Sequence, residues 1–451
     1  MTDRVVAGGT VVTAAGSAIA DVAIADGRIE AVGPGLARPG VETIDASGML
    51  VLPGAIDVHT HLRLPVADRP DRFRTDTLAA ARGGTTTLLS FNNPGTGISE
   101  AGARSLLGGL EEFRARTAGE SVVDYGLNAV VGSHQVDPLS EIPDLIAAGV
   151  PTFKAFMVYD FALDDARIEA ALALAARQGG MLMLHCEEPA IIDPLVADAL
   201  DRGDIGPRHH AHTRPPRAEA AATRKAIEMA RRAEAPLYVV HLSAAGALDA
   251  VAEAKSRGEP VYAETCPHYL AFTDELYAHP DDAEVLKRLI SPPLRSRADV
   301  EALWDGLRDG VLDVVASDHV PDRLDTEKRL PPPPFPQISN GGPGIETLLS
   351  VLYGLGVATG RIAIERLVAL LAANPARLFG LPAKGAVEPG RDADLVVWDP
   401  HVRRVITQAH LHHSSDFTPF EGLEVAGAPA RVLLRGEPAA AGRGQFLTRR
   451  L

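Results

Sequence analysis

Two histidines separated by one residue, His59 and His61, end an apolar stretch that begins at Met49. In a β-strand, residues i and i+2 point to the same side, so the two imidazoles can reach one point. Imidazole nitrogen is a common ligand for zinc and related transition metals. The pair therefore predicts part of a metal site, provided that further ligands stand at the ends of later strands.

Further candidate ligands do follow later strand-like runs, since His185, His241 and Asp318 each end one. Lys154 stands inside another apolar strand, which would aim its ammonium group into the protein. A buried ammonium must be paired or neutralised. A nearby carboxylate would pair with it, whereas carbamylation by CO₂ would turn it into an anionic oxygen donor able to bridge two cations. Together these side chains predict one metal-binding cluster.

The middle of the chain alternates strand-like runs with helical segments rich in Ala, Leu, Arg and Glu. Eight such runs predict an α/β fold, a (β/α)₈ TIM barrel, whose active site lies at the carboxyl ends of the strands. All the candidate ligands belong to this part of the chain. The expected strands are 50–59, 85–91, 125–131, 152–157, 181–185, 237–241, 261–265 and 311–318.

Both ends of the chain instead resemble short β-strands separated by turns that contain glycine. We expect residues 1–52 and 383–451 to meet in one small β-sandwich domain beside a barrel at 53–382. The 46% hydrophobic and 23% charged composition is that of a globular protein.

The net charge of −15 disfavours binding to nucleic acid. Cys186 and Cys266 are the only cysteines, which fits a reducing compartment. The sequence has neither a signal-peptide pattern nor an apolar run of membrane-spanning length, so we expect a cytoplasmic protein without a membrane partner.

The motifs resemble those of the amidohydrolase superfamily, in particular the cyclic amidohydrolases of the hydantoinase/dihydropyrimidinase branch. The resemblance runs nearly from end to end. It is carried by residues 54–61, 153–159, 185–188, 241–243, 264–270, 291–295, 317–321, 340–346 and 384–395.

This resemblance implies hydrolysis of a cyclic amide or imide at a binuclear metal centre, usually of zinc. The implied ligands are His59, His61 and Asp318 for one ion, His185 and His241 for the other, and N-carboxylated Lys154 between them. A metal-bridging hydroxide would be the nucleophile. Asp318 would accept its proton and later pass that proton to the leaving amide nitrogen.

The resemblance also implies residues that contact the substrate. Tyr159 matches the tyrosine that stabilises the tetrahedral oxyanion. Ser291 and Asn340 match positions that bind the cyclic amide, largely through backbone groups. The resemblance further suggests a homodimer or a homotetramer. A non-enzymatic scaffold related to dihydropyrimidinase is disfavoured, because all six ligand positions are retained.

The substrate is less well defined, because Arg63 and Asn93 resemble the dihydroorotase pattern for holding a carboxylate. Against that pattern, Asp322 stands where dihydroorotases commonly place a histidine, and it would repel a carboxylate. Arg63 could instead be solvated, or pair with Asp68 or Asp71. A hydantoin or a dihydropyrimidine is favoured, with dihydroorotase and allantoinase activities as alternatives.

Two further groups of histidines resemble metal-binding runs but lie away from the predicted strand ends. We expect both groups to be solvated surface residues. They are His209, His210 and His212, and His410, His412 and His413.

Overall fold

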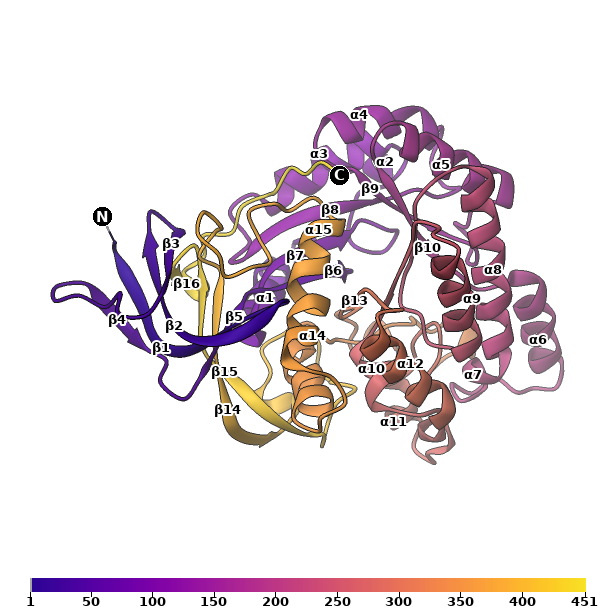
Figure 1. Cartoon of the computed structure of the whole chain (residues 1–451). Helices are drawn as coiled ribbons and strands as arrows, with labels where there is room; N and C mark the ends of the chain where they lie inside the picture. Colours follow the sequence, from indigo (N-terminus) through magenta and orange to yellow (C-terminus); the bar gives the residue numbers. More distant parts are fainter. Residues whose placement is uncertain (1) are drawn as a thin grey trace.

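The computed structural model describes residues 2–451, which form a parallel barrel and a second sheet beside it (Figure 1). Eight strands follow one another around the barrel in chain order. They are β6 (Ala55–Thr60), β7 (Thr85–Phe91), β8 (Asp124–Val130), β9 (Thr152–Phe156), β10 (Met181–His185), β11 (Leu237–Val239), β12 (Val261–Thr265) and β13 (Val314–Val315). The predicted (β/α)₈ fold is confirmed.

Helices cover the outside of the barrel, which explains why its strands are buried almost throughout. Helix α8 is amphipathic and lies between α5 and α9, with Ala218, Ala222, Ala226 and Ala230 facing inward. The covering helices are α1 (Arg72–Gly83), α3 (Leu106–Thr117), α4 (Ile142–Ala147), α5 (Asp165–Arg177), α8 (Pro216–Arg232), α9 (Ala245–Ser256), α12 (Arg297–Asp309), α13 (Leu348–Leu352), α14 (Ile364–Val368) and α15 (Asn374–Leu378).

Shorter helices and α6 lie in the connections between these elements. They are α2 (Glu100–Ala103), α6 (Pro189–Asp201), α7 (His209–Thr213), α10 (Pro267–Ala271) and α11 (Asp282–Leu286). Within residues 2–451, no helix has both the length and the apolar character needed to cross a membrane.

The first predicted strand, 50–59, is in fact two strands that belong to different sheets. β5 (Leu50–Pro53) pairs with the terminal strands, and β6 begins the barrel after Gly54. A Cβ atom on Gly54 would lie 2.1 Å from Thr86 Oγ1, so only glycine fits where the chain passes between the sheets. The continuous apolar pattern hid this division.

The eighth predicted strand, 311–318, is shorter than expected. Only Val314 and Val315 pair with β12, and Asp318 has left-handed backbone with a φ of 48°. The barrel instead closes through a parallel bridge between Thr60 and His319, and the His61 amide donates to the His319 carbonyl at 2.8 Å. This closure brings the histidine pair of β6 beside Asp318.

Strands from both ends of the chain meet beside the barrel, as predicted, and they form one sheet. Near the junction, β5 pairs in parallel with β1 and in antiparallel fashion with β14. The terminal strands are β1 (Arg4–Thr13), β2 (Gly16–Ala25), β3 (Arg28–Gly33), β4 (Glu42–Asp45), β14 (Leu395–Val405), β15 (Glu424–Leu434) and β16 (Glu437–Pro438). The domain limits 1–52, 53–382 and 383–451 stay a prediction.

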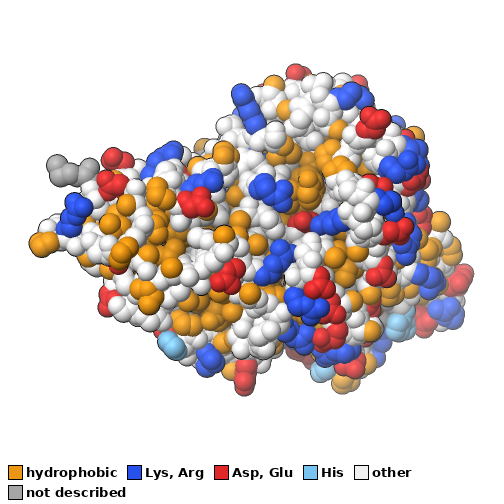
Figure 2. All heavy atoms as spheres, viewed as in Figure 1, with side chains coloured by type: hydrophobic (Ala, Val, Ile, Leu, Met, Phe, Trp, Pro, Cys, Tyr) orange, Lys and Arg blue, Asp and Glu red, His pale blue; other side chains and the backbone are white. Residues whose placement is uncertain are grey.

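The surface differs between the two parts of the molecule. On the face seen in Figure 2, hydrophobic side chains gather over the terminal sheet, whereas charged side chains of both signs mix over the barrel helices. The negative net charge is therefore not concentrated in one patch on this face.

The C-terminal segment returns to the barrel after β16. Phe446 bridges Tyr125 of β8, and the buried Arg449 side chain donates to the Leu127 carbonyl and to Thr152 Oγ1. Thr152 begins β9, so Arg449 lies at the amino end of the barrel, opposite the strand ends that carry the candidate ligands.

A buried lysine ties the terminal sheet to the barrel. Lys384 Nζ lies 2.5 Å from Asp124, 2.6 Å from Asp394 and 2.9 Å from Asp392. Burial favours the neutral amine, yet these carboxylates raise the pKa of Lys384 above its usual value. The ammonium therefore neutralises a set of carboxylates that would otherwise repel one another.

Replacing Lys384 with methionine should lower the free energy of unfolding by about 3–5 kcal/mol, because it leaves the buried Asp394 carboxylate without a cationic partner. Urea denaturation measures this loss. The matched control is Lys255→Met, whose ion pair with Asp313 is partly exposed and should cost about 1 kcal/mol or less. Equal stability of the two variants would contradict a structural role for Lys384.

Candidate active site

A cavity of about 590 Å³ opens at the carboxyl ends of the barrel strands. This volume is within the range of small-molecule sites. Ten of the eleven predicted site residues line it, and the exception is His59, which is fully buried. These ten are His61, Arg63, Asn93, Lys154, Tyr159, His185, His241, Ser291, Asp318 and Asn340.

The first group of candidate ligands is His59, His61 and Asp318. Their ligand atoms all lie within 4.8 Å of one another. The Nε2 atoms of His59 and His61 stand 3.1 Å and 3.3 Å from the same oxygen of Asp318. Burial opposes ionisation of this carboxyl, but the two imidazoles outweigh it and hold the pKa of Asp318 well below its usual range.

The second group is His185 and His241, whose rings pack edge to face with centroids 4.6 Å apart. Burial lowers the pKa of both imidazoles, and Lys154 lowers each further. Both rings are therefore neutral, which is the form that binds a metal.

Lys154 is fully buried, and its Nζ has no hydrogen-bond partner within residues 2–451. It lies 4.8 Å from the ring centre of Phe156 and 5.1 Å from that of Phe91. Burial lowers its pKa to about 8, although Asp318 and Glu264 oppose the change. A buried amine without a partner needs a ligand or a modification, so this set of donors fits a metal centre.

Three of the predicted site residues have strained backbone. Tyr159, His241 and Asp318 have φ values of 87°, 39° and 48°, in the left-handed region that side chains other than glycine avoid. Such strain costs about 1–3 kcal/mol per residue and tends to cluster at functional sites. Here it fixes the direction of three side chains toward the cavity.

The candidate ligands are held by a layer of polar partners that sequence reasoning largely missed. Glu264, which is fully buried, accepts a hydrogen bond from His59 Nδ1 and another from Tyr238. His61 Nδ1 bonds to Asn93 Oδ1 at 2.8 Å. Asn93 therefore orients a candidate ligand as well as lining the cavity. The sequence did offer a clue to Glu264, which lies near the carboxyl end of β12. We had used the motif 264–270 only as part of the family resemblance.

Glu264→Gln should weaken zinc binding by about 10- to 100-fold, because outer carboxylates fix ligand orientation and basicity. Chelator competition measures this affinity. Tyr238→Phe is the control: it removes one bond to Glu264 at 2.7 Å and leaves the contact with His59, so its loss should be smaller. Unchanged zinc affinity in Glu264→Gln would contradict this role.

Arg214 connects the second ligand group with Tyr159. It donates to Glu187, which in turn bonds to His185 Nε2 at 2.7 Å, and its guanidinium lies 5.3 Å from the ring centre of Tyr159. Burial raises the pKa of Tyr159, and Arg214 opposes that rise. The phenol is therefore protonated and able to donate. Arg214 was not among the site residues predicted from the sequence.

The prediction of solvated histidines is wrong for His210 and His413, which are both buried. His210 Nε2 lies 3.0 Å from the Ile290 carbonyl and 3.0 Å from Ser291 Oγ, and burial lowers its pKa to about 3. Neutral His210 therefore holds Ser291 at the cavity wall. A helix inserted between β10 and β11, α7, brings it there, and spacing alone could not reveal this.

Arg63 is neither solvated nor paired with Asp68 or Asp71. Its Nη2 lies 2.7 Å from Asp322 Oδ1, and its Nη1 donates to the Gly95 carbonyl at 2.7 Å. The other oxygen of Asp322 lies 3.7 Å from the buried Lys328 ammonium. The guanidinium is thus engaged in joining two loops that border the cavity.

Comparison with known proteins agrees with this geometry. Residues 50–439 match the family model described as "Amidohydrolase family". The chain belongs to the amidohydrolase family. This amidohydrolase is 40% identical over 442 residues to a D-hydantoinase of Geobacillus stearothermophilus, covering 96% of this chain and 92% of the relative.

Two further relatives support the same branch of the family. A D-hydantoinase of Streptomyces coelicolor is 41% identical, over 96% of this amidohydrolase and 93% of the relative. The crystal structure of a dihydropyrimidinase from Brevibacillus agri aligns with a TM-score of 0.93 at 37% identity, over 99% of this chain and 98% of the other. The predicted membership of the hydantoinase/dihydropyrimidinase branch is confirmed.

Proposed function

We propose that this amidohydrolase opens a cyclic amide or imide ring by hydrolysis, with a hydantoin or a dihydropyrimidine as the favoured substrate. The observation that carries the proposal is that His61, Asp318, Lys154 and Tyr159 line one cavity, while His59 lies 3.1 Å from Asp318. The names of the relatives, D-hydantoinase and dihydropyrimidinase, support the same class of substrate.

The donor set supports a centre of two divalent ions, with zinc favoured by its imidazole and carboxylate ligands. His59, His61 and Asp318 would hold one ion, and His185 and His241 the other. Lys154, once its neutral amine has added CO₂ and lost a proton, would offer an oxygen to each ion. When bound, the ions would activate water near neutral pH and polarise the amide carbonyl.

The protein's own groups then complete the reaction. Asp318 takes a proton from the attacking water, whose oxygen bonds to the carbonyl carbon. Tyr159 donates a hydrogen bond to the carbonyl oxygen as negative charge develops there. Asp318 returns the proton to the ring nitrogen when the carbon–nitrogen bond breaks. Ser291 and Asn340 hold the ring during these steps.

Two features of the cavity favour a hydantoin or a dihydropyrimidine over an acidic ring. The Arg63 guanidinium already donates hydrogen bonds to the Asp322 carboxylate and the Gly95 carbonyl. Much of the remaining wall is apolar and suits an uncharged substituent. The apolar lining residues are Phe156, Phe161, Val196, Val320, Phe335 and Ile338.

Steady-state assays of four ring substrates test this proposal. We expect kcat/KM for a 5-substituted hydantoin or for dihydrouracil to exceed that for dihydroorotate by about 100-fold or more, because the Arg63 guanidinium is already bonded to Asp322 and Gly95. Allantoin is the fourth substrate. Turnover of dihydroorotate alone would overturn the preferred class, and a purified protein that binds no divalent ion would favour the scaffold alternative.

A further inference from the structure

A second cluster of metal-binding side chains lies beside the candidate active site, just after β12. Cys266 Sγ, a ring nitrogen of His268 and an oxygen of Asp318 all lie within 4.8 Å of one another. Cys266 is fully buried, and His268 is only 7% exposed. Within residues 2–451, the cavity lining includes Asp318 but neither Cys266 nor His268. This cluster therefore shares one residue with the active site and lies outside its cavity.

The surroundings of the cluster favour a cation. His268 Nε2 is buried, and no other group in the described chain forms a hydrogen bond with it. Such an atom is costly unless a ligand satisfies it. Cys266 Sγ is buried next to the Asp318 carboxylate. A divalent cation bound between them would displace the thiol proton to solvent.

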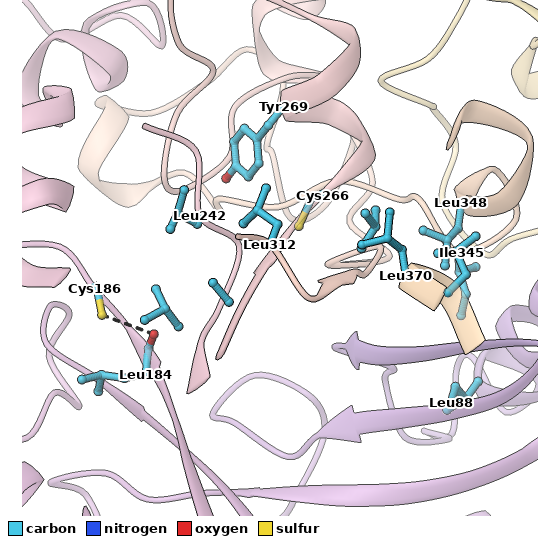
Figure 3. Close-up of a cluster of buried hydrophobic side chains, with 14 of the residues drawn as sticks. Leu88, Leu184, Cys186, Leu242, Cys266, Tyr269, Leu312, Ile345, Leu348 and Leu370 are labelled. Atoms are coloured by element: carbon cyan, nitrogen blue, oxygen red, sulfur yellow. Dashed lines mark hydrogen bonds between the residues drawn. The ribbon is translucent and has the colours of Figure 1, made fainter. Parts of the chain in front are cut away.

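The other cysteine has a different environment, which makes it a matched control. Cys186 Sγ donates a weak hydrogen bond to the Leu184 carbonyl at 3.5 Å (Figure 3). Both thiols are buried and free of disulfides. Of the two cysteines, only Cys266 belongs to a group of candidate metal ligands within residues 2–451.

We propose that Cys266, His268 and Asp318 form an inhibitory site for a thiophilic divalent cation such as Zn²⁺ or Cd²⁺. The sulfur, nitrogen and oxygen donors suit these ions, whereas Mg²⁺ prefers oxygen alone. The inhibition rests on the proposed function, in which Asp318 carries the proton between water and the ring nitrogen. An ion bound to Asp318 from the side of Cys266 removes the carboxylate from that task.

Cobalt titration of the whole enzyme tests the site. The ligands proposed for the main centre contain only nitrogen and oxygen, so a thiolate-to-cobalt absorption band reports an ion on a cysteine. We expect excess Co²⁺ to produce this band while hydrolysis falls. Cys266→Ser should abolish the band and raise the half-inhibitory Co²⁺ concentration by about tenfold or more. Cys186→Ser should behave like the wild type, and Mg²⁺ should not inhibit.

Absence of the band from wild type, or its persistence in Cys266→Ser, would overturn the proposal. Should Cys266→Ser fail to fold, His268→Gln provides the same test, and wild-type binding and inhibition in that variant would count against the site. The band does not depend on turnover. A protein that shows the band but hydrolyses no cyclic amide would therefore refute the proposed function and retain the cation site.

Discussion

Replacing Lys154 with alanine should remove both the bound metal and the hydrolysis of cyclic amides. Lys154 lines the same cavity as His61, His185 and His241, and its buried amine has no hydrogen-bond partner in residues 2–451. Without a bridging donor, we expect metal affinity and kcat/KM each to fall by about 100-fold or more. Elemental analysis after gel filtration and steady-state kinetics measure the two losses.

Lys328→Met is the matched control for this experiment. Lys328 is also fully buried, but its ammonium donates to the Leu289 carbonyl at 2.9 Å and to the Ser339 carbonyl at 2.7 Å. We expect this variant to lose stability and to keep its metal. Reconstituting wild type in buffer depleted of CO₂ should also slow metal loading. Full activity of Lys154→Ala, or of metal-free wild type, would refute the binuclear mechanism.

Tyr159→Phe should lower kcat by about 100- to 1,000-fold, the usual cost of removing one donor to a developing oxyanion. The tyrosine ring packs against Phe161 and His185, so phenylalanine can keep the same position. The metal content should not change, because the phenol is not among the proposed ligands. KM should change much less than kcat, since the hydrogen bond strengthens only in the transition state.

Tyr353→Phe controls for the general effect of losing a buried phenol. Tyr353 packs against Trp398 of the terminal sheet, with ring centroids 5.0 Å apart, and does not line the cavity. Its kcat should match that of wild type. A Tyr159→Phe enzyme with normal kcat would exclude Tyr159 as the oxyanion donor and direct attention to backbone donors.

The candidate ligands were predictable because each follows a strand that can be recognised from its own apolar residues, and because parallel barrel strands all end on the same side. His59, His185 and Asp318 each follow an apolar run, and parallel strands bring such residues to the same end of a barrel. The division at Gly54 was not predictable in this way. An apolar strand that changes sheets has the same composition as one that does not.

The partners around the ligands were harder to foresee, because they depend on pairing between distant loops. Arg63 and Asp322 are 259 positions apart, and no periodicity relates them. His210 reaches Ser291 only because α7 folds over the cavity. Loop conformation determines both contacts, and single-sequence reasoning predicts loops least well.

The terminal sheet has a consequence for how the protein is made. β5 leaves the ribosome early, yet its antiparallel partner β14 follows only after the entire barrel. At about 5–20 residues per second, the early strands wait roughly tens of seconds with an unpaired edge. During synthesis this unpaired edge can pair with the corresponding strand of a neighbouring nascent chain. A chaperone that covers the terminal strands through β5 would therefore act on yield rather than on catalysis.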